Sequence, residues 1–245
     1  MRIRALVAAL AVVLLSAACS GGSLFRSYEY EEEMYLALDG TATLYVNSSA
    51  AALNALRGTA LPLDPNAAID KATVARIYAS PHTRVTRVTF SSRRNRRFVH
   101  VRMDVDNVAA LSAVAPFAWS TYRLEPDQRL VHYRQEVGAA AGVSVGEVGW
   151  QPDDLVAFRI HLPSKIVYHN AGPENLRRGN ILVWEQPLAA RLAGAPLLLE
   201  TRVESQSILY RTIRLFGATF AVVSCLFVLI LWRVVKSAPK AVQRR

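Results

Sequence analysis

Cysteine is nearly absent from this 245-residue chain, which contains two cysteines. Cys19 follows a first apolar run, and Cys225 lies inside a second apolar run near the C-terminus. The roughly 190 residues between these runs hold no cysteine, which excludes a disulfide framework and a cysteine-based zinc site there. They are numerous enough to form a hydrophobic core, and that core must stabilise the domain alone.

Acidic residues are also scarce, because 19 Asp and Glu stand against 29 Lys and Arg and give a net charge of +10. Most of this excess lies at the two ends of the chain. Two arginines before the first apolar run account for +2, five basic residues after the second account for +5, and +3 is left between them. Nucleic-acid binding needs positive charge clustered on a folded face. We therefore expect no nucleic-acid partner.

Short motifs for catalysis or metal binding are missing as well. His100, His132, His161 and His169 lie in or beside predicted strands, without the short ligand spacing of a zinc site. Ser144 lies in the small-residue stretch GVSVG with no helix after it, so it lacks the context of a nucleophile elbow. We expect no cofactor, no metal ion and no catalytic residue. A Ser–His pair formed only by the fold stays open.

The first apolar run is typical of an export signal. Arg2 and Arg4 precede the stretch ALVAALAVVLL, and small residues follow it. We predict a signal peptide over residues 1–18. The ending LLSAACSGG resembles the bacterial lipobox, in which cleavage before the cysteine exposes it for lipid attachment, although Ser16 stands where the lipobox usually has Leu. We expect lipid attachment at Cys19, with cleavage by ordinary signal peptidase as the alternative.

The second apolar run predicts a transmembrane helix over residues 213–235. Residues 215–232 carry no charge, and 18 helical residues cover about 27 Å, which is close to the hydrocarbon thickness of a bilayer. The tail over 236–245 is basic and has no acidic residue. The positive-inside bias therefore predicts a cytoplasmic C-terminus and an extracytoplasmic domain over residues 19–210.

Patterns of apolar residues between the two runs predict strands with a few short helices. The alternation from Tyr28 to Leu38 and the turn dipeptide Asp39-Gly40 predict a first hairpin. Helices are expected at 51–56, 66–79 and 107–114, and further strands at 85–90, 98–105, 119–124, 130–137, 155–162, 166–168, 181–184 and 197–203. This order predicts an α+β fold, a mostly antiparallel sheet with two or three short helices packed on it, plus one C-terminal transmembrane helix. The Gly- and Ala-rich segment 138–149 is expected to be a linker.

One region resembles a known family. The stretch AFRIHLPSKIVYHN, residues 157–170, and the later RRGNILVWEQPL resemble the closing hairpin of bacterial membrane-anchored lipoproteins of the LppM-type (DUF3153) family. The order of export signal, lipobox-like cysteine, domain, membrane helix and basic tail is similar too. The chain departs from the family at Pro163-Ser164, where Pro-Gly is usual. The resemblance implies an α+β domain associated with binding lipid or lipoglycan, and it implies no catalytic residue.

Charged residues gather at two places in the predicted domain. Arg93, Arg94, Arg96 and Arg97 surround the turn RRNRR, where guanidinium groups suit the phosphates of lipid head groups. The alternative for these arginines is a solvated hairpin turn. The acidic residues of 29–33 lie on the first strand, where we expect them to protect a sheet edge against association.

These observations predict a membrane-tethered extracytoplasmic binding module without catalysis. We expect its ligand to be lipid, glycolipid or an envelope partner, bound in an apolar pocket that Trp119, Trp150 and Trp184 either line or support from the core. An envelope hydrolase acting on lipid or cell wall and a structural assembly partner in the envelope are the alternatives. The expected location is the bacterial inner membrane, crossed once. The sequence identifies neither a protein partner nor an oligomeric state.

Overall fold

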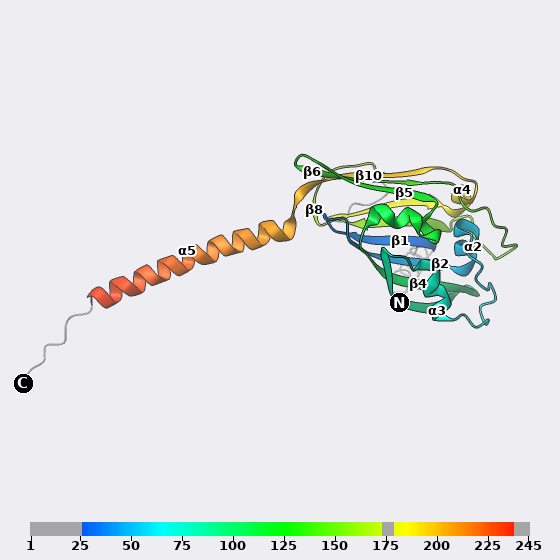
Figure 1. Ribbon diagram of the computed structural model, residues 1–245, viewed down its shortest axis with the longest axis horizontal. Coiled ribbons are helices and arrows are strands. Elements are labelled where there is room, and N and C mark those ends of the chain that lie inside the picture. Colours follow the sequence, from blue (N-terminus) through cyan, green and yellow to red (C-terminus); the bar gives the residue numbers. More distant parts are fainter. Residues whose placement is uncertain (1–25, 173–178, 238–245) are drawn as a thin grey trace, which may run out of the picture.

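Strands of the chain form two sheets in the computed structural model, which describes residues 26–172 and 179–237 (Figure 1). The two sheets lie as layers, and one continuous cluster of buried side chains joins them. The predicted signal peptide over 1–18, Cys19 and most of the basic tail, residues 238–245, lie outside the described residues. The expected α+β class with a mostly antiparallel arrangement is confirmed, although the strands divide between two sheets instead of one.

The first sheet has six strands in the order β3-β4-β2-β1-β7-β9. All neighbours are antiparallel except β1 and β7, which are parallel. Its strands are β1 (Tyr28–Leu36), β2 (Ala42–Ser49), β3 (Thr83–Arg93), β4 (Arg96–Val105), β7 (Leu155–His161) and β9 (Ile181–Pro187). The predicted hairpins β1–β2 and β3–β4 are confirmed. The expected edge position of the acidic first strand is wrong, because β1 lies between β2 and β7.

The second sheet has four antiparallel strands in the order β5-β6-β10-β8. They are β5 (Ser120–Asp127), β6 (Leu130–Val137), β8 (Ser164–His169) and β10 (Leu197–Ser207). Alternate residues of these strands are buried, among them Tyr122, Tyr133 and Leu199, and they meet Tyr30 and Phe158 of the first sheet in the core. The period-2 burial explains why this sequence forms half-buried strands.

Short helices connect the strands. They are α2 (Ala50–Arg57), α3 (Lys71–Tyr78), the 3₁₀ helices η1 (Val108–Ala113) and η2 (Ala115–Phe117), and α4 (Leu188–Leu192). Side chains cap three of them, α2, α3 and η1. Ser49 caps α2, and Gly58 ends it with a φ of 69°. The second helix is shorter than predicted, because Asp70 accepts the backbone N–H groups that begin α3. The sequence patterns did not predict α4.

Residues 138–149 form a connection without helix or strand. The backbone N–H of Ala141 bonds to the Leu56 carbonyl at 3.0 Å, and that of Gly138 bonds to the Trp119 carbonyl at 2.7 Å. Strands from before and after the segment pair in both sheets, as β1 with β7 and β6 with β10. The segment therefore lies against the domain and joins parts that share both sheets.

The last strand continues directly into the long helix α5 (Ile208–Ser237). The Ser207 hydroxyl accepts the N–H of Tyr210 at 3.1 Å, and the Ile208 N–H bonds to the Pro163 carbonyl at 3.0 Å. Residues Ile208–Val234 have a mean hydropathy of 2.4, and none of the most apolar window is buried within the chain. Since the described part of the chain leaves this window exposed, the helix is a candidate membrane span and not the buried core helix of a globular domain.

Strand directions define two ends of the domain. The near end, from which α5 leaves, holds Ser207, its partner Ser164 and the start of β6 at Leu130. The far end holds Tyr28 and the turn between β3 and β4, and α2 and α4 lie there too (Figure 1). A strand of the length of β4 spans about 33 Å. The near and far ends are therefore roughly 30 Å apart.

Candidate functional site

The arginine-rich turn joins β3 and β4 at the far end of the domain. Arg94 and Asn95 have φ angles of 49° and 57°, as the two central residues of a tight hairpin turn with twisted strands require. The register pairs Arg93 with Arg96 on either side of it. The four predicted arginines therefore lie close together, as the sequence spacing implied.

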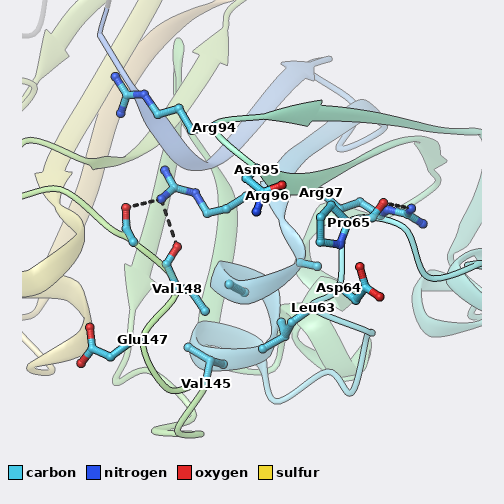
Figure 2. A pocket seen from close by; sticks show the side chains of 13 residues that line it. Leu63, Asp64, Pro65, Arg94, Asn95, Arg96, Arg97, Val145, Glu147 and Val148 are labelled. Carbon is cyan, nitrogen blue, oxygen red and sulfur yellow. Dashed lines mark hydrogen bonds between the residues drawn. The ribbon is translucent and has the colours of Figure 1, made fainter.

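Arg96 is buried and holds three parts of the chain together. Its guanidinium lies 2.8 Å from a Glu29 carboxylate oxygen and 3.5 Å from Asp154, both of which are fully buried. It also donates to the carbonyl oxygens of Val148 and Gly149 (Figure 2). Charge-assisted bonds of this kind are stronger than neutral ones, so Arg96 fastens the start of β1 to the loop before β7.

The other three arginines also bond to the protein. Arg93 donates to the Tyr28 carbonyl at 2.6 Å, and Arg94 lies 3.5 Å from Asp154. Arg97 donates to the carbonyl oxygens of residues 65 and 67 on the opposite side of the turn from Arg96 (Figure 2). A groove of about 530 Å³ lies beside this turn. Because every one of the four guanidinium groups has protein partners, this geometry favours a structural role for them.

A buried ion pair lies between the two sheets. The side chains of Glu32 and Arg57 are 3% and 1% exposed, and they form a direct ion pair. The Tyr30 hydroxyl donates to Glu32 at 2.6 Å, and the Arg57 guanidinium lies over the Trp119 ring. The sequence analysis missed this pair. The available signal was the position of Glu32, which shares one face of the strand with Tyr30 and with the buried Met34.

A second buried arginine adds positive charge to the same interior. Arg191 of α4 is fully buried, donates to the Gly138 carbonyl and lies 3.3 Å from the Gln186 amide oxygen. Burial lowers the pKa of Arg191, and the charge of Arg57 lowers it further. Among the described residues, buried side-chain atoms of Arg57, Arg191, Trp119 and Tyr78 have no protein hydrogen-bond partner. Ordered water is the usual partner of such groups.

The four histidines singled out in the sequence, His100, His132, His161 and His169, lie in four different strands. His132 bonds to Glu200 at 3.0 Å, and His161 bonds to Glu33 at 2.7 Å. Within residues 26–172 and 179–237, no three His, Cys, Asp or Glu side chains are grouped so that they could hold a metal ion.

The fold forms one Ser–His pair that the sequence left open. On the first sheet, Nε2 of His100 lies 2.8 Å from the Ser91 hydroxyl, and its Nδ1 lies 3.0 Å from the Asn47 amide oxygen. Burial lowers the pKa of His100, and the nearby charge of Arg93 lowers it further. A neutral histidine between a hydroxyl and an orienting group has the contacts of a general base. Ser91 lies in a strand and not on a sharp turn, so the backbone does not present it as a nucleophile elbow does.

A further groove lies at the near end, where the domain meets α5. We call it the junction groove; its lining residues are Arg129, Leu130, Val167, Glu204, Ser205, Gln206 and Arg211. Its volume is about 670 Å³. The β5–β6 turn, the end of β10, strand β8 and the second turn of α5 each contribute to it. The sequence analysis did not single out these residues, because they come from four segments that only the fold brings together.

The tryptophans divide between the core and its margin. Trp184 is buried, and its ring N–H donates to the Asn170 side-chain oxygen at 2.9 Å. Trp119 and Trp150 are partly buried and pack against the core.

Comparison of the chain with protein-family models, with curated proteins and with solved structures found no match. The site must therefore be interpreted from its own geometry.

The buried ion pair predicts an asymmetric response to substitution. Glu32→Leu or Arg57→Met alone leaves an unpaired buried charge and should lower the free energy of unfolding by about 3–5 kcal/mol. The double variant removes both charges and should lose less stability than either single variant. Urea denaturation of the full-length protein in detergent checks this order. Losses that simply add in the double variant would show that the two side chains do not interact.

The lowered pKa of His100 predicts that the stability of the folded protein depends on pH. Its folded pKa lies below the ordinary value of 6.5, so the unfolded chain binds more protons as the pH falls through that value. His100 therefore contributes stability above about pH 6.5 that is lost at lower pH. Arg93→Gln should raise the pKa, because it removes a nearby positive charge. NMR titration of the imidazole measures both values, and an unchanged pKa in the variant would contradict the stated cause.

Proposed function

We propose that this protein is a membrane-tethered module that binds lipid or glycolipid on the extracytoplasmic side of the bacterial inner membrane. The observation that carries the proposal is the direct passage of β10 into the candidate membrane helix α5. No loop separates them, so the near end of the domain stands at the bilayer surface. A domain held there meets lipid at high local concentration.

Charge distribution supports an outward-facing domain. Arg233 and Lys236 follow the apolar part of α5, and the remaining tail in the sequence adds three more basic residues. The positive-inside bias places this side in the cytoplasm. The signal-like N-terminus agrees with export of the domain that follows it.

A lipid at Cys19 would add a second tether with a geometric limit. Nine residues lead from Cys19 to Tyr28, which lies at the far end of the domain. Fully extended, they reach about 30 Å, which is roughly the distance between the two ends. Both anchors therefore fit one leaflet only with an extended N-terminal segment or a tilted domain. The resemblance to the LppM-type family favours the lipid anchor and lipid binding.

One specific contact favours the alternative of an envelope hydrolase. Ser91, His100 and Asn47 form a hydrogen-bonded row on the first sheet. In a hydrolase, Ser91 would react with a fluorophosphonate probe and Ser91→Ala would abolish labelling. The binding module needs no such reactivity, because the row also serves as a set of polar contacts between neighbouring strands.

Native mass spectrometry of the full-length protein extracted in mild detergent tests the proposal. We expect retained lipid in the wild-type protein and equal retention in the Ser91→Ala variant. The same spectra report whether the N-terminus carries an acyl group. A wild-type protein that carries no lipid and binds none when phospholipid is added back would contradict the proposed function.

A further inference from the structure

We propose that the junction groove binds the phosphate of a phospholipid head group from the leaflet that faces the domain. Arg129 and Arg211 of the groove lining and Lys165 beside the groove would contact the phosphate. The inference rests on the proposed function of lipid binding and assigns a site to it. The sequence analysis had placed head-group contacts at the arginine-rich turn instead.

The depth of the groove relative to the bilayer is the first argument. The uncharged part of α5 begins at Leu215, and Arg211 lies four residues before it. Four helical residues rise about 6 Å. The head-group layer on each side of the hydrocarbon is roughly 5–7 Å thick. Arg211 therefore stands at the depth of the lipid phosphates, and the groove that it lines opens at the same level.

The charge in and beside the groove is the second argument. Arg129 is exposed and has no ion-pair partner within the part of the chain that the structure describes. Arg211 pairs with Glu204, and Lys165 lies 3.8 Å from the same carboxylate. Three cations thus face one carboxylate, which leaves an excess of positive charge. An arginine carries five N–H donors, so Arg211 keeps donors for a phosphate after its bond to Glu204.

The apolar surroundings of the groove fit the same occupant. Val167 lines the groove and is 54% exposed, and its neighbour Tyr168 is 44% exposed. Tyr210 and Leu209 of the first turn of α5 are also exposed. Tyrosine prefers the level between head groups and acyl chains, where its ring and hydroxyl meet different surroundings. A phospholipid offers an apolar chain beside its phosphate, whereas a free anion offers no counterpart to the apolar residues.

The arginine-rich turn has neither the depth in the bilayer nor the incompletely paired cations of the junction groove. It lies at the far end, roughly 30 Å from the start of α5. Arg93, Arg94 and Arg96 pair with the buried carboxylates of Glu29 and Asp154. Arg97 donates to backbone carbonyls instead. The exposed and less fully paired cations at the near end are the better phosphate ligands.

The test compares two double variants of the full-length protein that lose the same charge. Arg129→Ala/Lys165→Ala changes the junction groove. Arg87→Ala/Arg123→Ala is the matched control, because both arginines are exposed on strands away from the groove. Phosphatidylglycerol is titrated into each delipidated protein in detergent, and bound lipid is counted by native mass spectrometry. Circular dichroism melting confirms that both variants are folded.

We expect apparent affinity to fall about fivefold for each cation removed from the groove and to stay unchanged in the control. Equal binding by the wild type and both variants would overturn the assignment of the lipid site to the junction groove and leave the proposed lipid binding intact. Equal losses in both variants would also overturn it, since unspecific charge would then explain the binding. Displacement of the lipid by inorganic phosphate would identify a free-anion site and overturn the lipid assignment. No binding by the wild type would overturn the proposed function itself.

Discussion

The junction between β10 and α5 is the constraint on which the proposed function depends. A membrane helix on a flexible linker would leave the domain free to turn any face to the lipid. Here the strand becomes the helix at Ser207 and Ile208, and bonds from both residues hold the first turn. The domain therefore has a defined near end. Because strands run between the two ends, the same junction sets which loops can reach the bilayer and which stand roughly 30 Å above it.

Pairing between buried charges decides the role of the charged residues at the far end of the domain. The acidic stretch of β1 and the arginine-rich turn look like separate surface features in the sequence, but the fold makes them partners. Glu29 neutralises Arg96, and Glu31 lies 2.8 Å from Arg159 on the neighbouring strand. Removing two opposite charges from water is costly unless they meet each other. These pairs therefore fasten the far end and the sheet, and they leave the arginines of the turn less available to a ligand than the cations of the junction groove.

The sequence predicted local structure well and long-range pairing poorly, for a physical reason. Alternation and turn dipeptides are local, so the hairpins β1–β2 and β3–β4 and the apolar helix α5 were predictable. The parallel pairing of Tyr28 with Leu155 joins segments far apart in the chain, and no periodicity reports it. The same holds for the two sheets, for the Glu32–Arg57 pair and for the junction groove. The arginines were correctly placed at a turn, but their partners come from segments that only the fold brings near.

Collisional quenching by lipids that carry a head-group quencher measures the orientation of the domain most directly. Gln128 and Asn95 are matched positions, because both are hairpin-turn residues with positive φ angles, one at each end of the domain. A fluorophore is attached at one or the other in the full-length protein, reconstituted in vesicles. The account predicts strong quenching at residue 128 and little at residue 95. Equal quenching at both positions, or stronger quenching at 95, would contradict a domain that rests on the bilayer by its near end.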